Sequence, residues 1–156
     1  GNILGNHDGL MYFTLGQRQG IGLGGIKGKE QDSWYVAHKD LVSNELTVIQ
    51  GNNNKLLLSE GCYVDDIHWI NEQEEPEFDC DVQIRYKSLP IKSRVKKLNT
   101  GYKILFSKPQ LAVTPGQSAV IYRGDECLGG SVIRERISQD FYNWATNRGY
   151  NYKVYG

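Results

Sequence analysis

The chain has 156 residues, and its 18 basic and 18 acidic side chains leave a formal net charge of zero. This length suits one compact domain or two small ones. The charge balance excludes a uniformly basic nucleic-acid coat but allows a local basic patch.

Cysteine spacing and hydropathy indicate in which cellular compartment the protein is expected. The three cysteines are far apart in the sequence, which argues against a disulfide framework or a CxxC motif and favours a reducing compartment. No apolar stretch approaches the roughly 20 residues of a membrane span, and no signal peptide is visible at the start. We expect no membrane partner and a cytoplasmic location, with an organellar matrix as the alternative. Because the chain starts without an initiator Met, we also expect a piece of a longer protein.

The first half is rich in glycine and in short β-prone runs. These runs predict strands at residues 10–15, 34–38 and 46–50, with shorter candidates at 56–58 and 62–64. A glycine-dense loop, residues 16–25, follows the first of them. The acidic stretch 72–81 contains Pro76 and predicts a domain boundary. We therefore assign residues 1–73 to a small central β-rich domain.

In the second half, apolar and polar residues alternate along the chain with a period of two. Cys80, Val82, Ile84 and Tyr86 point one way and the polar residues between them point the other, which predicts a half-buried strand. Further strands are predicted at residues 102–106, 118–122 and 126–133, with a hairpin turn at 123–125 between the last two. Short strands at this spacing predict an antiparallel β-barrel over residues 74–135.

The last segment has a helical pattern. Ser138 is a good N-cap, Phe141 and Ala145 share one face, and Gly149 follows as a helix-ending glycine. We assign residues 136–156 to a helical tail. The predicted fold class is thus mainly β, with a small central domain, a C-terminal antiparallel barrel and a short C-terminal helix.

Several motifs suggest catalysis or metal binding, but each has a simpler interpretation. The G-x-G-x-G-G pattern of residues 20–25 is similar to a dinucleotide-binding loop, yet no helical pattern follows it. A nucleotide-binding enzyme stays open as an alternative to a structural or contact-making loop. The histidines lack metal-ligand spacing, and the cysteines are interpreted as buried thiols. We predict no catalytic residue, no metal site and no cofactor within this chain.

A basic stretch is the strongest functional signal. Residues 85–97 hold six cations and no acid, and Lys92, Arg94 and Lys96 alternate so that they share one strand face. Cations on a sheet bind phosphates, and Tyr86 can stack on a base. The alternative is a solvated sheet face. The RNA-binding candidates of this stretch are Arg85, Tyr86, Lys87, Arg94 and Lys96.

Five segments together resemble one family. They are Gly5-Asn6-His7-Asp8-Gly9 running into Thr14-Leu15-Gly16-Gln17-Arg18, then Trp34-Tyr35-Val36 with Asn44, Ile84-Arg85-Tyr86, Thr114-Pro115-Gly116-Gln117, and Cys127-Leu128-Gly129-Gly130. Over about residues 1–133 the chain resembles the tRNA-specific 2-thiouridylases. Ser131 departs from the family pattern, which has a third glycine there, and the tail is unmatched.

The resemblance implies an enzyme with three parts. An N-terminal ATP-pyrophosphatase domain with an S-G-G-x-D-S loop and two catalytic cysteines uses ATP with magnesium and a persulfide sulfur donor to thiolate the wobble uridine at C2. A central domain and a C-terminal barrel hold the tRNA. This chain matches only the last two parts, so we expect a non-catalytic tRNA-binding portion of a transferase. The implied partners are tRNA, the chain's own N-terminal catalytic domain and a sulfur-relay protein.

Three tRNA-binding roles follow from the resemblance by position. Arg85 and Tyr86 match the family's Arg-Tyr pair, and Gln117 matches a glutamine after Pro-Gly. Without the resemblance, Gln117 is equally well interpreted as a turn residue. The 16–25 loop faces either the catalytic domain or the RNA, and the sequence does not decide between them. A free-standing RNA-binding barrel is the alternative function.

Overall fold

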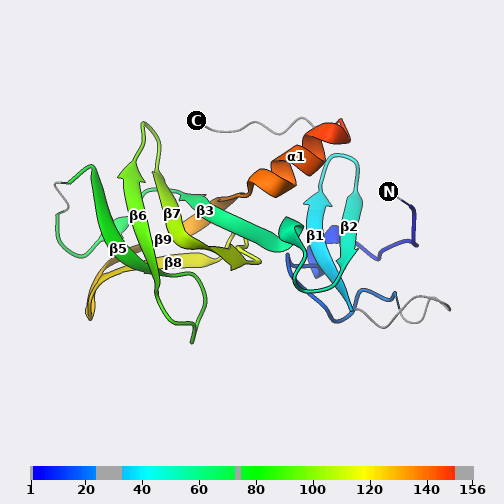
Figure 1. The fold of residues 1–156 in the computed structure, drawn as a ribbon, viewed down its shortest axis with the longest axis horizontal. Helices are drawn as coiled ribbons and strands as arrows, with labels where there is room; N and C mark the ends of the chain where they lie inside the picture. The colour runs from blue at the N-terminus through cyan, green and yellow to red at the C-terminus, as the bar shows by residue number, and fades with distance from the viewer. Residues whose placement is uncertain (1, 24–32, 73–74, 150–156) are drawn as a thin grey trace. The chain divides into compact units, whose positions relative to one another are not determined.

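The computed structural model describes residues 2–23, 33–72 and 75–149, and the chain divides into two compact units, Gly1–Leu57 and Leu58–Gly156 (Figure 1). The predicted boundary falls on residues 73 and 74, which lie outside the described residues. The strands that flank this position, β4 (His68–Trp69) and β5 (Glu77–Gln83), belong to one sheet of the second unit.

The first unit is built around a β-hairpin. Its strands, β1 (Trp34–Asp40) and β2 (Glu45–Gln50), pair antiparallel and confirm the strands predicted at 34–38 and 46–50. Asp40 closes the turn between them, because its Oδ1 accepts the backbone N–H groups of Val42 at 2.8 Å and Ser43 at 3.2 Å. These bonds lower the pKa of the Asp40 carboxyl.

The strand predicted at residues 10–15 is wrong. Leu10–Tyr12 forms a short 3₁₀ helix, η1, in which the N–H of Phe13 donates to the carbonyl of Leu10 at 3.2 Å. Leu10 and Phe13 are buried and the two residues between them are exposed, so the apolar period is three rather than two. The Nζ of Lys39 also donates to the carbonyl of Phe13 at 2.7 Å. In a sheet, the backbone N–H of a neighbouring strand would make this bond.

The candidate at 56–58 is wrong in a similar way. Lys55–Leu57 forms a second 3₁₀ helix, η2, and the strand β3 begins only at Leu58. The side chain of Asn54 accepts the N–H of Leu56 at 3.0 Å, and the N–H of Leu57 donates to the Asn54 carbonyl at 3.0 Å. Asn54 thus starts a helical turn where apolarity alone predicts a strand.

The second unit is a closed antiparallel barrel, which confirms the predicted architecture (Figure 1). Its strands follow the order β3-β7-β6-β5-β8-β9, and β3 pairs with both β7 and β9, so that the sheet closes on itself. The short strand β4 adds to β9. The bounds are β3 (Leu58–Val64), β6 (Ile91–Lys97), β7 (Tyr102–Leu111), β8 (Ser118–Arg123) and β9 (Glu126–Ile137), with β4 and β5 as given above.

The barrel interior follows the alternation read from the sequence. Cys80, Val82 and Ile84 are buried in the main apolar cluster, as predicted. Tyr86 was expected on the same side but is 92% exposed, because the chain leaves β5 after Gln83 and turns. The alternation therefore ends two residues before Tyr86.

The close approach of β4 to β9 depends on a glycine. A Cβ at Gly129 would collide with the backbone carbonyl oxygen of His68 and lie 3.1 Å from the Cα of Trp69. At the next residue, Gly130, the nearest atom to such a Cβ is the carbonyl oxygen of Ala119 at 3.4 Å. Only the first glycine of the pair is required by packing.

The predicted C-terminal helix is confirmed as α1 (Gln139–Asn147). The Ser138 hydroxyl accepts the N–H of Phe141 at 3.3 Å, and Glu60 of β3 accepts the N–H of Gln139 at 3.2 Å. Phe141 and Ala145 bury the apolar face. Residues 150–156 of the expected tail lie outside the described residues. Within the described ranges, no helix is long and apolar enough to cross a membrane.

Candidate RNA-binding end of the barrel

The candidate residues implied by the resemblance meet at one end of the barrel. Gln83, the last residue of β5, pairs with Val120 of the antiparallel strand β8. Arg85 and Tyr86 follow β5, and Gln117 directly precedes β8. Because antiparallel neighbours run in opposite directions, the end of one strand lies beside the start of the other. The fold thus brings together residues that are more than 30 positions apart in the sequence.

A tight turn presents Tyr86 to solvent. The N–H and the hydroxyl of Ser88 both donate to the carbonyl of Arg85, at 3.2 Å and 2.9 Å. Lys87 has a φ of 65°, the left-handed conformation that non-glycine residues adopt at some cost. Its Nζ lies 5.5 Å from the centroid of the Tyr86 ring. An exposed aromatic ring next to a cation suits stacking on a base beside a phosphate.

Arg85 points toward the segment after β7. Its Nη2 donates to the carbonyl oxygen of Ala112 at 3.0 Å and also to that of Leu111. Both partners are backbone carbonyls, one on the last residue of β7 and one on the first residue of the connection that leads to Gln117. The guanidinium therefore contacts protein as well as solvent.

Gln117 stands at the other end of this connection. Its N–H donates to the carbonyl of Thr114 at 3.2 Å, and its carbonyl accepts the N–H of Ile133 at 2.8 Å. Its side chain is exposed and has no hydrogen-bond partner among the described residues. The amide group is thus available to a ligand.

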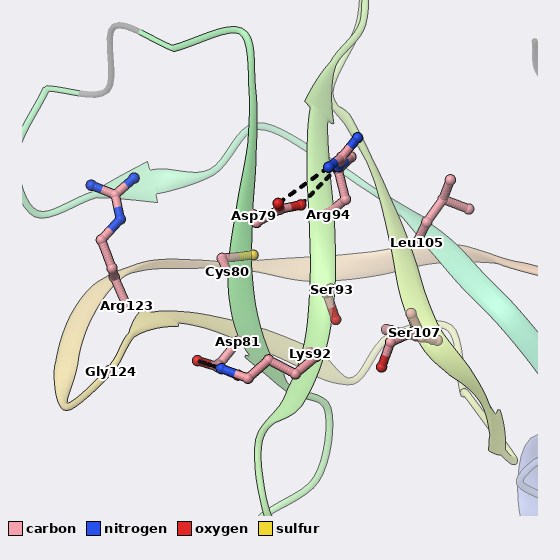
Figure 2. A pocket seen from close by; sticks show the side chains of 11 residues that line it. Asp79, Cys80, Asp81, Lys92, Ser93, Arg94, Leu105, Ser107, Arg123 and Gly124 are labelled. Atoms are coloured by element: carbon pink, nitrogen blue, oxygen red, sulfur yellow. Dashed lines mark hydrogen bonds and ion pairs between the residues drawn. The ribbon is translucent and has the colours of Figure 1, made fainter.

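The cations of β6 have a different environment. Lys92, Arg94 and Lys96 do share one exposed face, as their spacing predicts. Each faces a carboxylate of β5 across the pair, and Figure 2 shows the guanidinium of Arg94 turned toward Asp79. The shortest ion-pair distances are 2.9 Å for Lys92–Asp81, 2.7 Å for Arg94–Asp79 and 3.5 Å for Lys96–Glu77.

These ion pairs change the electrostatics of the predicted basic face. The hydrogen bond from Arg94 lowers the pKa of the Asp79 carboxyl and raises the pKa of Arg94. A phosphate that approaches Arg94 or Lys96 must compete with a carboxylate already in place. These acidic partners are not among the residues predicted for the site, although their alternation at Glu77, Asp79 and Asp81 matches that of the cations.

A pocket of about 580 Å³ lies over the same strands and reaches the β8–β9 hairpin. Arg123 and Gly124 of the hairpin line it together with Cys80, Ser93 and the paired charges of β5 and β6 (Figure 2). Burial raises the pKa of the Cys80 thiol to about 11 and that of Cys62, in the core, to about 12. These two thiols stay protonated near neutral pH, so neither is poised as a nucleophile.

The glycine loop is tied to β1 in its described part. The Gly16 N–H donates to the Val36 carbonyl at 2.8 Å, and the Val36 N–H donates to the Gln17 carbonyl at 3.0 Å. The Gln17 side chain also accepts the N–H of Thr14 at 2.8 Å. These bonds give residues 14–17 a structural role. Gly24 and Gly25 lie outside the described residues.

His7 also has a structural environment in the first unit. Its Nε2 lies 3.0 Å from the carbonyl oxygen of Asn44, and its Nδ1 accepts the N–H of Gly9 at 3.1 Å. Within the described residues, no group of His, Cys, Asp and Glu side chains could hold a metal ion.

Comparisons with known proteins match the chain in two parts. A family model described as a tRNA methyl transferase PRC-barrel domain matches residues 1–50, and one described as an aminomethyltransferase beta-barrel domain matches residues 59–133. Proteins named tRNA-specific 2-thiouridylase MnmA from Actinobacillus pleuropneumoniae serotype 3 and Mannheimia succiniciproducens are 48% identical over 139 residues. The corresponding protein of Pasteurella multocida is 48% identical over 140 residues. Each alignment covers 88% of this chain and 36% of the relative.

Proposed function

Because this chain belongs to the tRNA-specific 2-thiouridylase family, we propose that it is the tRNA-holding C-terminal portion of an enzyme that thiolates the wobble uridine at C2. The chain spans about a third of the length of the relatives it matches, 36%. It contains no S-G-G-x-D-S loop. The proposal therefore assigns the use of ATP with magnesium, and the transfer of persulfide sulfur, to the part of the enzyme outside this chain.

The observation that carries the proposal is the meeting of Arg85, Tyr86 and Gln117 at one end of the barrel. Tyr86 offers a stacking surface for an unpaired base, and Lys87 offers a charge for the adjacent phosphate. Gln117 offers an amide that can donate to and accept from a base edge or a ribose hydroxyl. This combination of aromatic, cation and amide suits an RNA region whose bases are not all paired.

Arg94 and Lys96 take a lesser part in this proposal. Both cations are paired with carboxylates on β5. Their attraction for phosphate is therefore partly cancelled before RNA arrives. We assign them a weak, salt-dependent contribution along the barrel wall.

The remaining partners follow from the same assignment. The chain's own catalytic domain presents the reacting centre to the wobble uridine while this portion holds the rest of the tRNA. A sulfur-relay protein supplies the persulfide to that domain. We place the complete enzyme in the cytoplasm, where its tRNA substrate is found.

A binding measurement tests the proposal directly. The 156-residue chain is titrated with bulk unmodified tRNA over a salt series, alongside Tyr86→Ala, Gln117→Ala and the control Tyr12→Ala, which removes another exposed tyrosine. We expect salt-sensitive binding that the first two variants weaken by about threefold or more and that the control leaves unchanged. Absence of binding by the folded chain at low salt would overturn the proposal.

A free-standing RNA-binding barrel would give the same binding result. The coding sequence immediately upstream separates the two functions. An upstream S-G-G-x-D-S loop with two separated cysteines supports the thiouridylase. An upstream region without them supports the independent module.

A further inference from the structure

The connection between β5 and β6 carries Tyr86 beyond the paired part of the two strands. Their pairing ends at Val82 and Ile91, and residues 84–90, which we call the Tyr86 turn, lie between the strands. Lys87 in this turn has a φ of 65°, in the left-handed region that a side chain adopts only at a cost. Such a conformation persists only where neighbouring groups hold it. The exposed position of Tyr86 therefore depends on the bonds that hold the turn.

The side chain of Gln83 makes one of these bonds across the turn. Its Nε2 donates to the backbone carbonyl oxygen of Ser88 at 2.8 Å, in a partly buried position. The side-chain oxygen of the same amide lies 3.5 Å from the hydroxyl of Tyr122 on β8, which can donate to it. Both contacts agree with an amide whose nitrogen faces the turn and whose oxygen faces the barrel wall.

Gln83 itself is anchored in the sheet, and Ser88 extends the hold to the start of the turn. Gln83 is the last residue of β5 and pairs with Val120 of β8. The N–H and the hydroxyl of Ser88 both donate to the carbonyl of Arg85, at 3.2 Å and 2.9 Å. The bonds from Gln83 to Ser88 and from Ser88 to Arg85 thus enclose the two residues at the tip, Tyr86 and Lys87.

We propose that Gln83 is a positioning residue, whose side-chain amide holds the Tyr86 turn in the conformation that presents Tyr86 to RNA. This inference rests on the proposed function, because it assumes that tRNA binds at this end of the barrel. Gln83 acts through Ser88 and the turn, whereas Tyr86 contacts the RNA. Losing the amide of Gln83 should therefore weaken mainly the part of RNA binding that this turn contributes.

A double-mutant cycle between Gln83 and Tyr86 tests this dependence. Gln83→Met keeps a side chain of similar length but removes the donor. Affinity for bulk unmodified tRNA is measured for Gln83→Met, Tyr86→Ala and the double variant. We expect Gln83→Met to bind about two- to fivefold more weakly. The double variant should bind more tightly than the product of the two single effects requires, because the amide acts in part through Tyr86.

Two matched controls separate positioning from a general loss of structure. Gln139 of α1 makes a similar side-chain bond, to Asn143 at 2.9 Å, so Gln139→Met should leave tRNA binding unchanged. The effects of Gln83→Met and Gln117→Ala should multiply, because Gln117 is held by bonds to Thr114 and Ile133 that do not involve the turn. The urea midpoint of Gln83→Met should stay close to that of the unaltered chain.

Trypsin digestion without RNA gives a second readout, since the Tyr86 turn contains a cleavage site after Lys87. Gln83→Met should speed cleavage there by about threefold or more, because local opening exposes the bond. Cleavage after Arg123, in the turn between β8 and β9, should not change. An unchanged rate after Lys87, or effects of Gln83→Met and Tyr86→Ala that multiply fully, would overturn the positioning role and leave the proposed function standing. A folded chain that binds no tRNA would overturn the proposed function and, with it, the presentation of Tyr86 to RNA.

Discussion

Arg94 and Asp79 face each other across the β5–β6 pair in a two-bond arrangement. The Nε of Arg94 lies 2.7 Å from one carboxylate oxygen of Asp79, and Nη2 lies 3.1 Å from the other. The planar guanidinium thus already contacts the kind of group, an oxyanion, that a phosphate would present. The positive charge of Arg94 that is evident in the sequence is therefore partly neutralised by Asp79 before any ligand binds.

Removing the carboxylate should make Arg94 available to RNA. We expect Asp79→Asn to bind tRNA about two- to threefold more tightly at low salt and to steepen the salt slope by up to about one phosphate. Fluorescence titration over a salt series measures both quantities. Asp66→Asn changes the net charge equally at an exposed position between β3 and β4 and serves as the control. Equal effects of the two variants would point to net charge alone.

A partly buried carboxylate should make stability depend on pH. Burial raises the pKa of Glu135 above its ordinary value of 4.5. The folded state therefore binds this proton more tightly than the unfolded chain, and the resulting stability is lost as pH rises through the folded pKa. Glu135→Gln should raise the free energy of unfolding at pH 7 by less than about 1 kcal/mol, and the gain should vanish near pH 4.

Chemical denaturation at the two pH values measures this difference. Glu126→Gln, at an exposed position of the β8–β9 hairpin, provides the control and should change stability equally at both. A Glu135→Gln gain that is the same at pH 4 and pH 7 would contradict burial of the charge as its cause.

The cysteines should differ in reactivity. With pKa values of about 12 for Cys62 and about 11 for Cys80, the thiolate fraction at pH 8 is very small. Both are also buried, whereas Cys127 is partly exposed. We expect iodoacetamide to modify Cys127 first and to modify the other two only after denaturation. Mass spectrometry of the intact and digested chain checks this order, and rapid modification of Cys80 in the folded chain would be the contrary result.

Two adjacent glycines should respond to the same substitution with very different losses of stability. Gly129→Ala places a methyl group against the His68 carbonyl and should lower the free energy of unfolding by about 1–3 kcal/mol. Gly130→Ala meets nothing closer than 3.4 Å and should change it by less than about 0.5 kcal/mol. Urea denaturation of both variants measures the contrast. Equal losses would mean that β4 does not approach β9 as closely as described.

Local signals in the sequence predict much of the fold. The alternation from Cys80 to Ile84, the N-cap Ser138 and the hairpin turn at 123–125 each depend on neighbouring residues only, and each is confirmed. Residues 10–15 fail because apolar content alone does not distinguish a strand from a 3₁₀ turn. Lys39, which is distant in sequence, donates to the carbonyls of Leu10 and Phe13, and no local pattern shows this contact.

The candidate site depends more on contacts between distant segments. Family resemblance identifies Arg85, Tyr86 and Gln117, but no local pattern shows that Arg85 donates to Ala112, which is 27 positions away. The ion pairs of β6 depend likewise on the register of β5 against β6. Strand register and the partners of a long side chain are set by tertiary packing. A single sequence therefore identifies candidate residues but does not predict which groups they contact.

The double pairing of β3 has a practical consequence for anyone who shortens this chain. The acidic stretch 72–81 suggests itself as a boundary for a shorter fragment. A fragment starting at residue 74, however, would lack β3, the strand that pairs with both β7 and β9. The closed barrel would become an open sheet with two unpaired edges, each ready to recruit a strand from another molecule. Such a fragment should precipitate or associate, whereas one starting before Leu58 keeps the ring of hydrogen bonds whole.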